Sequence, residues 1–316
     1  MKIPITQSKS WAKLQEDLGE EYHLVKEANF QYLAIVKHTA IGNYLYCPYG
    51  PVASSKQSFQ EAIRSLEQLG RELSAIFIRI EPIDPAQVAF LPSNTRKSKD
   101  INPKETWVLN LEQDEQSIIK GFSHGVRNGY NTASKKGLII ETTTDPSEIT
   151  HLTSLQRTLA QSKNIRPYPV EYLKAELQQP FAILYKVKYQ KPENIDESDK
   201  LPAGNQVIAA SLFFDYEGTR YYMQSASDSR YKKLPATAAL LANAIIDARQ
   251  KGMKEFDFWG IAPEGASSDH PWYGFTKFKK SFGGQEKHYA GTYDLVLEST
   301  KYKLYKATRR LGSLLH

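Results

Sequence analysis

The sequence predicts an α/β (α+β) protein with two domains of similar construction, and three observations support this. Strand, amphipathic helix and strand follow one another in residues 32–80, and the same order restarts near residue 106. The chain has 316 residues, enough for two domains of ordinary size, and 41% of its residues are hydrophobic. We expect mixed, largely antiparallel sheets, one in residues 1–104 with 291–316 and one in residues 105–290.

In the first domain, "YLAIVKH" (32–38) and "NYLYCP" (43–48) predict two paired strands around a turn. The clearest helix is predicted at 58–73, where Ser58 and Glu61 form a capping-box pattern. Five apolar residues follow one face of this helix: Phe59, Ile63, Leu66, Leu69 and Leu73. The run "AIFIRI" (75–80) comes next and predicts a buried strand.

The second domain continues with the same alternation. Its expected elements, in chain order, are a strand at 106–111, a polar helix near 113–120, a strand at 138–144, a helix at 147–163, a strand at 181–189, a hairpin around Glu217–Gly218, a helix at 234–252 and a strand at 253–261. The loop 190–205 has no core-forming residues, so we interpret it as a long hairpin connection. A last basic helix, 300–316, is expected to pack on the first half.

The order of long helix, antiparallel hairpin, helix and strand in the second half is that of acetyltransferase-like (GNAT) folds. In those folds, the helix after the long hairpin begins in a glycine-rich turn that holds the pyrophosphate of coenzyme A. Here the turn is "SRYKKLPATA" (229–238), which has no glycine. Its side chains would keep backbone amides away from a pyrophosphate, so we expect neither an acyl-CoA donor nor another cofactor.

The composition excludes several other classes of function. The single cysteine, Cys47, rules out a disulfide framework, and the seven histidines lack metal-ligand spacing, so we expect no metal site. The phosphate-loop, HExxH and GxSxG motifs are absent. The formal charge of +6 weakly favours anionic partners. Because no signal peptide and no apolar run of about 18 residues is found, we expect a cytoplasmic protein.

The segment "FTKFKKSF" (275–282) holds three lysines among three phenylalanines and follows a predicted strand, at whose end α/β proteins bind ligands. Lys279 adjoins the apolar face of the predicted helix, whereas Lys277 and Lys280 point outward. Three phenylalanines, spaced by three and four residues, make that face: Phe275, Phe278 and Phe282. Two interpretations remain open, an amphipathic helix with solvated lysines or a lysine held for chemistry.

Three other segments also allow two interpretations each. The motif "YCPYGPV" (46–52) is either a rigid turn or one wall of a substrate site. Trp11 and Lys13 either anchor a helix, with the lysine stem on apolar surface, or contribute to binding. Arg166 either pairs with Glu171 or presents its guanidinium to a phosphate or carboxylate.

In combination these motifs resemble the FemABX aminoacyltransferases, which form peptidoglycan bridges and have two acetyltransferase-like domains. The resemblance runs almost from end to end of the chain, and the order and spacing of the motifs carry it. They are "SWAKLQ", "YCPYGPV", "IRIEP", Arg127 with "KKGLII", "RPYPVEY", "FDFWGI", "FTKFKKSFGG" and "GTYDLVL". The coiled-coil arm of the larger members is not seen, so the chain is similar to the compact FemX type.

The resemblance implies an aminoacyl-tRNA donor and a peptidoglycan precursor as acceptor, either UDP-MurNAc-pentapeptide or lipid II. It implies that Lys279 interacts with the donor acyl group, and Glu81 stands where the family has an acidic residue proposed as general base. Six further residues are implied at the acceptor: Lys13 and Arg166 at the nucleotide-sugar phosphates, Trp11 in the Lys13 motif, Tyr172 along the acceptor, Tyr168 as an alternative to Arg166, and Gln224 at a position usually aromatic.

We therefore predict direct acyl transfer, in which Lys279 stabilises the oxyanion and Glu81 either deprotonates the attacking amine or orients it. Two basic segments with interleaved tyrosines, 127–137 and 301–310, are candidate tRNA contacts. In the first of them we expect the contacts from Arg127, Lys135 and Lys136. The second segment could instead lie peripherally on an anionic membrane surface, or simply cover the first domain.

Two other functions remain open at this level. One is a non-catalytic RNA-binding protein, and the other is an aminoacyl-tRNA:protein transferase, whose acceptor would be a protein N-terminus. We expect the protein to be a monomer.

Overall fold

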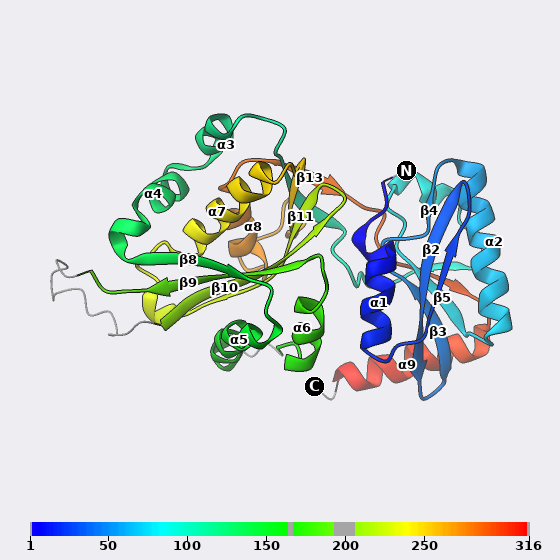
Figure 1. Cartoon of the computed structure of the whole chain (residues 1–316). Helices are drawn as coiled ribbons and strands as arrows, with labels where there is room; N and C mark the ends of the chain where they lie inside the picture. The colour runs from blue at the N-terminus through cyan, green and yellow to red at the C-terminus, as the bar shows by residue number, and fades with distance from the viewer. Residues whose placement is uncertain (1, 164–166, 193–205, 315–316) are drawn as a thin grey trace. The chain divides into compact units, whose positions relative to one another are not determined.

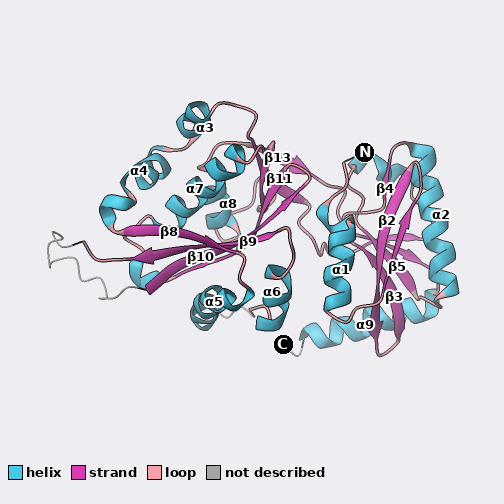
Figure 2. Cartoon of the chain, in the orientation of Figure 1, coloured by secondary structure: helices cyan, strands magenta, loops and turns pink. Residues whose placement is uncertain are grey.

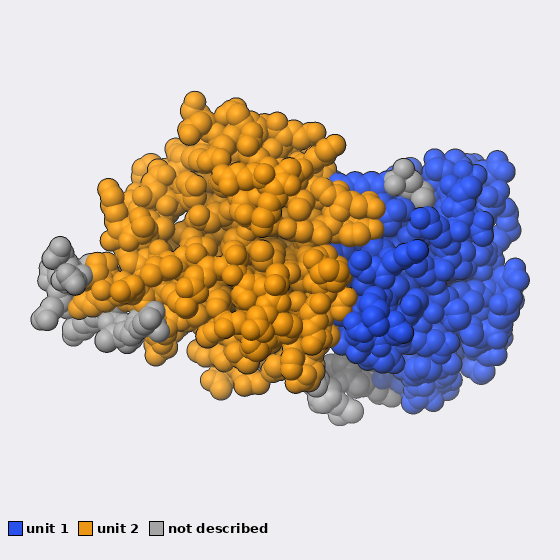
Figure 3. Space-filling view, viewed as in Figure 1, with its two compact units in different colours: residues 1–104, 288–316 blue, residues 105–287 orange. Residues whose placement is uncertain are grey.

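A computed structural model describes residues 2–163, 167–192 and 206–314 of the chain. The chain divides into two compact units (Figure 3). Unit 1 comprises residues 1–104 and 288–316, and unit 2 comprises residues 105–287.

Unit 1 is built on a seven-stranded sheet with the order β1-β2-β3-β5-β14-β6, in which the short strand β4 pairs with β2. The β3–β5 pair is parallel, whereas the neighbouring pairs are antiparallel. The strands are β1 (Tyr22–Lys26), β2 (Phe30–Thr39), β3 (Gly42–Cys47), β4 (Val52–Ala53), β5 (Phe77–Ile80), β6 (Thr95–Lys97) and β14 (Tyr293–Val296).

Alternating side chains of β5 meet different helices, because successive residues of a strand point to opposite faces of the sheet. Ile78 lies in the core that includes α2 (Lys56–Glu72), whereas Phe77 packs against Tyr302 and Tyr305 of α9 (Ser299–Leu314). Figure 1 shows these two helices against the sheet of unit 1, together with α1 (Lys9–Asp17). The prediction that the last helix packs on the first half of the chain is confirmed.

The predicted capping box of Ser58 and Glu61 is wrong, because α2 begins at Lys56. Ser55 is the N-cap: its Oγ accepts from the Ser58 N–H at 3.1 Å, and the Ser55 N–H donates to Ser58 Oγ at 2.9 Å. The capping box therefore lies three residues earlier than predicted, with Ser55 as the N-cap and Ser58 at position N3. The apolar face predicted for this helix does lie in the core of unit 1.

Unit 2 is built on a second seven-stranded sheet, with the order β13-β7-β12-β11-β10-β9-β8. Its strands are β7 (Glu105–Asn110), β8 (Leu138–Thr143), β9 (Ala182–Tyr189), β10 (Gln206–Tyr216), β11 (Thr219–Ser227), β12 (Glu255–Gly260) and β13 (Gln285–His288). β9 and β10 pair antiparallel, which confirms a hairpin; of the loop between them, residues 193–205 lie outside the described residues. Both sheets are therefore mixed and largely antiparallel, and the predicted α/β (α+β) class is confirmed (Figure 2).

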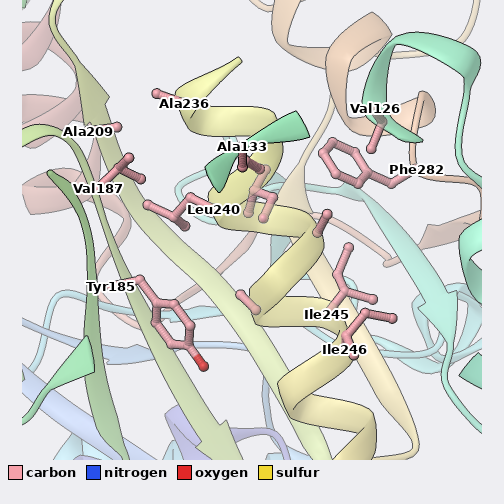
Figure 4. Packing of buried hydrophobic residues seen from close by; sticks show 14 of the residues in the cluster. Val126, Ala133, Tyr185, Val187, Ala209, Ala236, Leu240, Ile245, Ile246 and Phe282 are labelled. Carbon is pink, nitrogen blue, oxygen red and sulfur yellow. The ribbon is translucent and has the colours of Figure 1, made fainter. Parts of the chain in front are cut away.

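Helices cover both faces of the unit 2 sheet (Figure 1). The core on one face joins strands to four helices: α3 (Glu115–Gly121), α4 (His124–Thr132), α7 (Ala236–Gln250) and α8 (Tyr273–Lys280). In Figure 4, Leu240 and Ile245 of α7 lie among Tyr185, Val187 and Phe282. The opposite face carries α5 (Ile149–Lys163), which packs on β10 and β11, and α6 (Val170–Leu177), which packs on β9.

The first turn of α7 is covered by α4. A Cβ atom at Gly129 of α4 would lie 2.8 Å from the side chain of Pro235, the N-cap residue of α7. Only glycine allows this approach of the two backbones. The N-terminus of α7 therefore has a helix packed against it, at the place where acetyltransferase-like folds hold a pyrophosphate.

Candidate active site

The two parallel strands at the centre of the unit 2 sheet pair over only part of their length. β11 and β12 pair from Thr219↔Glu255 to Tyr221↔Asp257, although β11 continues to Ser227 and β12 to Gly260. Backbone groups and side chains beyond the last pair therefore become available to other partners. The predicted catalytic lysine lies at this point.

Lys279 reaches the end of β12 from the last turn of α8. Its Nζ donates to the Gly260 carbonyl at 2.6 Å and lies 5.9 Å from the centre of the Tyr222 ring on β11. The side chain is half-buried, whereas Lys277 and Lys280 on the same helix are exposed, as the helical phase predicted. Burial lowers the pKa of the Lys279 ammonium to about 8, and the nearby Asp257 acts in the opposite direction.

An irregularity in β12 orients the Gly260 carbonyl toward Lys279. The register between β12 and β7 shifts after Asp257, and Trp259 adopts a left-handed backbone conformation with φ of 64°. Asp257 Oδ1 accepts the Trp259 N–H at 2.7 Å and so stabilises this turn of the chain. Burial raises the pKa of the Asp257 carboxyl to about 6. Such local strain is a known feature of functional sites.

Asp257 belongs to no motif with a known catalytic role. The signal that could identify it is a carboxylate between Phe256 and Phe258, in a strand whose side chains are buried on both faces. A buried acid in such a strand needs a specific hydrogen-bonding partner. Here the partners are the N–H of Trp259, at 2.7 Å from Oδ1, and the Thr106 hydroxyl, at 3.4 Å from Oδ2.

The three phenylalanines around Lys279 do not form one buried face. Phe282 is buried and Phe278 packs partly against the core, but Phe275 is 48% exposed. α8 ends at Lys280, so Phe282 lies beyond the helix, and the helical spacing cannot apply to all three residues. Phe275 instead lies beside Trp272 and Tyr273 in sequence, which are 44% and 43% exposed.

A bulge in β11 places Tyr222 and Gln224 on opposite faces of the unit 2 sheet. Phe213 pairs with Tyr222 but Leu212 pairs with Gln224, so the intervening Met223 is the extra residue. Tyr222 consequently faces Lys279 and stacks on Phe213, with ring centres 5.5 Å apart, whereas Gln224 meets α5 on the opposite face. A one-residue insertion reverses the alternation of faces along a strand.

The predicted acceptor residues of unit 2 lie together on the α5 and α6 face. Tyr168 and Tyr172 stack with ring centres 5.3 Å apart, and Tyr168 interacts with Gln224. Gln224 Oε1 in turn accepts from Gln156 Nε2 of α5 at 3.3 Å. The tyrosine pair and Gln224, predicted separately, are thus one cluster, and Gln156 is a member that no motif indicated. Arg166, predicted to bind phosphate, lies outside the described residues.

Glu81 is buried in unit 1, and both of its carboxylate oxygens are occupied. Oε2 accepts from Asn102 Nδ2 at 2.7 Å, from the Tyr46 hydroxyl at 3.0 Å and from the Tyr49 N–H at 3.3 Å. Oε1 accepts from the Thr292 hydroxyl at 2.8 Å and from the Asn102 N–H at 3.0 Å. These partners come from "YCPYGPV", from residue 102 and from the start of "GTYDLVL", so Glu81 ties three motifs together. A saturated carboxylate of this kind favours the orienting role over the general base.

Lys13 and Trp11 both lie on α1. The Lys13 ammonium is exposed and contacts Glu16 at 3.1 Å and Asp17 at 3.0 Å, and these carboxylates raise its pKa, Asp17 most strongly. A phosphate would have to compete with both of them for the ammonium. The Trp11 side chain is buried, and Ser8 Oγ accepts its backbone N–H at 3.0 Å.

The residues predicted to contact tRNA differ in their surroundings. Arg127 donates through Nη1 to the carbonyls of Lys120 and Phe122, at the end of α3, so part of its guanidinium supports the fold. Lys135 is exposed and Lys136 is half-exposed. In the last helix, Tyr302 and Tyr305 are buried against Phe77, so these two rings are not exposed for stacking on bases, and the packing agrees with the alternative that this helix covers the first domain.

No three His, Cys, Asp or Glu side chains among residues 2–163, 167–192 and 206–314 gather into a cluster that could hold a metal ion. Within the same ranges, no helix combines the length and the apolar character needed to span a bilayer.

Comparisons with known proteins identify a family and similar folds. The sequence model of the FemAB family matches residues 151–310. No curated protein matches the chain in sequence. The crystal structure of FemX matches with a TM-score of 0.81 and 16% identity, over 95% of this chain and 94% of that chain. L-PGS from Bacillus licheniformis matches with a TM-score of 0.58 and 13% identity, over 99% of both chains. A tandem GNAT protein from the clavulanic acid biosynthesis pathway matches with a TM-score of 0.50 and 9% identity, over 86% of this chain and 81% of that chain.

Proposed function

The chain belongs to the FemAB family, and from this premise we propose that it transfers an amino acid from aminoacyl-tRNA to a peptidoglycan precursor. The family consists of acyltransferases of peptidoglycan bridge synthesis in general. What we propose beyond this is the donor, the acceptor and the role of each residue. The acceptor group is the side-chain amine of the third residue of the stem peptide, in UDP-MurNAc-pentapeptide or lipid II.

One observation carries the proposal: the half-buried Lys279 ammonium lies where the parallel strands β11 and β12 stop pairing. An ammonium has three N–H donors, and the Gly260 carbonyl accepts one of them. The remaining donors can stabilise a negative charge that develops on a carbonyl oxygen. In a partly buried site such a donor is worth about 3 kcal/mol of the barrier.

The reaction we propose is direct acyl transfer. The neutral amine of the acceptor attacks the ester carbonyl at the 3′ end of the tRNA and forms a C–N bond. The resulting oxyanion is stabilised by Lys279, after which the C–O bond to the ribose breaks. The amine loses one proton, the ribose oxygen gains one, and an amide remains. Because the ester is already reactive, positioning of the two substrates supplies much of the remaining acceleration.

Two features of unit 2 support an RNA-linked donor over acyl-CoA. The N-terminus of α7, where a pyrophosphate would have to bind, is covered by α4 through Gly129. In addition, exposed aromatic side chains gather at the start of the helix that carries Lys279: Trp272, Tyr273 and Phe275. Exposed rings stack on unpaired bases without sequence preference, which suits the single-stranded 3′ end of a tRNA. We propose further tRNA contacts at Lys135, Lys136 and Arg127.

For the acceptor we propose the roles implied by the resemblance. Tyr168, Tyr172 and Gln224 contact the stem peptide, and Lys13 with Arg166 binds the phosphates, beside Trp11. Glu81 orients the site through the motifs that it ties together. Peripheral contact with the membrane follows if lipid II is the acceptor.

A transfer assay tests the proposal. The purified protein is incubated with a mixture of radiolabelled aminoacyl-tRNAs and, in separate arms, with UDP-MurNAc-pentapeptide, lipid II in vesicles, or a peptide with a free N-terminus. Label in either precursor supports the proposal, and the arm that is labelled identifies the acceptor. Label in the free peptide alone would favour a protein transferase, and tRNA binding without any transfer would favour the RNA-binding protein; both contradict the proposal.

A further inference from the structure

Glu176 is a buried carboxyl group without a full set of partners. It lies in α6 and is 2% exposed, and its Oε2 has no hydrogen-bond partner among residues 2–163, 167–192 and 206–314. Burial raises its pKa to about 8, and the Tyr172 hydroxyl opposes this rise only in part. Leaving such a group unpaired costs stability, so its presence in a folded protein calls for a functional explanation.

A second acceptor without a partner belongs to the same cluster. Gln156 donates through Nε2 to Gln224, while its own Oε1 is buried and unpaired. From Gln156 the contacts run through Gln224 and the stacked Tyr168–Tyr172 pair to Glu176, because Tyr172 and Glu176 are one helical turn apart. The cluster therefore ends at both sides in an oxygen that lacks a donor.

The charged side chains nearby do not supply this donor among the described residues. On β9, the Lys186 ammonium is bound to Glu148 and lies 3.8 Å from Glu141. Lys174 on α6 and Arg157 on α5 are exposed. Tyr168 and Tyr172 are the remaining titratable groups of the cluster, and of these Tyr172 acts on Glu176. A partner suited to the ionised carboxylate carries N–H donors and a positive charge.

We propose that the Glu176 carboxylate receives the primary ammonium group of the acceptor stem peptide. The aliphatic stem of that amine would lie along the stacked rings of Tyr168 and Tyr172, and peptide N–H groups would reach Gln156 Oε1. This inference rests on the proposed function and adds to it the group that recognises the amine before it is deprotonated. Recognition by a buried carboxylate would reject stem peptides whose third residue has no amine, because the carboxylate would then stay unpaired.

Binding at this site has a defined proton balance. In the free protein near neutral pH the carboxyl is protonated, and the amine of the ligand is an ammonium ion. Pairing requires the carboxylate, so one proton leaves Glu176 for the solvent and none leaves the amine. The affinity for the acceptor should therefore rise with pH up to about 8 and then level off.

Calorimetric binding of UDP-MurNAc-pentapeptide in the absence of tRNA tests this inference. The ligand is used in its native form and with the side-chain amine acetylated, over pH 6 to 9, in buffers of different ionisation enthalpy that reveal proton release. Glu176→Gln should weaken native ligand binding by roughly 10- to 100-fold at pH 8 and abolish its pH dependence. Acetylation should weaken wild-type binding to a similar extent but leave Glu176→Gln binding unchanged.

Glu171→Gln is the matched control, because Glu171 is exposed on the same helix. It should leave affinity and proton release unchanged. Equal wild-type affinity for the native and acetylated ligands, or unchanged affinity in Glu176→Gln, would overturn the inference while leaving the proposed function intact. A wild-type protein that binds neither this precursor nor lipid II would contradict the proposed function and, with it, this inference.

Discussion

Glu81 in unit 1 and Glu176 in unit 2 are equally buried carboxyl groups, each 2% exposed, but their surroundings differ. Glu81 accepts hydrogen bonds from four residues, and both of its oxygens are used. Glu176 has Tyr172 beside it and an oxygen that has no partner in the part of the chain that the structure describes. Burial alone therefore does not distinguish a structural acid from a binding acid; the number of donors around it does.

The same contrast holds for the buried cations. Arg79 of unit 1 is held by Asp294 through two hydrogen bonds of 2.7 and 2.9 Å and by Ser98 at 3.1 Å. Lys279 of unit 2 donates a hydrogen bond to the Gly260 carbonyl at 2.6 Å, and burial lowers its pKa. Unit 2 has a fully paired cation of its own, because the buried Arg220 is held by Asp215 and Asp247. Paired charges therefore hold the fold of both units, whereas Lys279 and Glu176 keep a donor and an acceptor for substrates. The predictions below test this division.

The largest effect is expected at Lys279. Lys279→Ala should lower the rate of acyl transfer by roughly 100- to 1,000-fold, because the oxyanion loses a charged donor. Precursor binding by calorimetry and the free energy of unfolding should stay close to wild type. Lys277→Ala is the control, since Lys277 is exposed on the same helix. Equal loss of transfer and of precursor binding would show that Lys279 holds the substrate or the fold and does not act on the transition state.

Glu81→Gln should act mainly on stability. The new amide nitrogen would face N–H groups of Tyr49 and Asn102, which are hydrogen-bond donors, so at least one of them loses its acceptor. We expect the free energy of unfolding to fall by roughly 2–5 kcal/mol, measured by urea denaturation. Transfer activity, normalised to folded protein, should fall by less than it does in Lys279→Ala. A loss of activity of that size with unchanged stability would instead identify Glu81 as the general base.

The pH dependence of Lys279 offers a third test. Its lowered pKa of about 8 means that the ammonium is lost as the pH rises above this value, whereas an arginine stays charged. The ratio of kcat/KM in Lys279→Arg to that in wild type should therefore increase by up to about tenfold for each pH unit above 8. The ratio cancels the titration of the acceptor amine, which both proteins share. A ratio that is constant between pH 7 and 10 would contradict a charged role for Lys279.

Elements formed by local patterns could be predicted from the sequence. Hydrophobic periodicity located β2, β3 and β5 of unit 1, the strands β7 to β12 of unit 2 and the helices α2 and α7, but it missed the short strands β4, β6 and β13 and the strand β1. The helical phase distinguished Lys279 from Lys277 and Lys280. Where two local patterns competed, prediction failed. Two pairs of residues have the three-residue spacing of a capping box, Ser55 with Ser58 and Ser58 with Glu61. The first pair forms the box, because the helix begins at Lys56.

The parts that depend on distant residues could not be predicted. Glu81 meets Thr292 across 211 positions of the chain, and a bulge at Met223 decides which residues of β11 face Lys279. Glu176 carried a weak signal, because Leu173 and Leu177 place it on the apolar face of its helix. Its missing partner, however, is visible only once α5 and α6 are packed on the sheet.

The smallest effect is expected at Asp257, and it concerns how the free energy of unfolding depends on pH. The pKa of this carboxyl is about 6 in the folded protein and 3.8 for the free side chain, so the folded state binds the proton more tightly. Its stabilising contribution is complete below pH 4 and is lost as the pH rises through about 6. Asp257→Asn keeps an acceptor for the Trp259 N–H and removes this titration.

The variant should therefore match wild type in unfolding free energy near pH 4 and exceed it by roughly 1–3 kcal/mol at pH 8. Activity should change in the opposite direction, by a few-fold at pH 8, because Asp257 favours the charged form of Lys279. An Asp257→Asn protein that is less stable at pH 8 would mean that the carboxylate charge itself holds the Trp259 turn. Asp257 would then belong with Glu81 among the acids that hold the fold, and Lys279 and Glu176 alone would remain as the charged groups proposed to act on substrates.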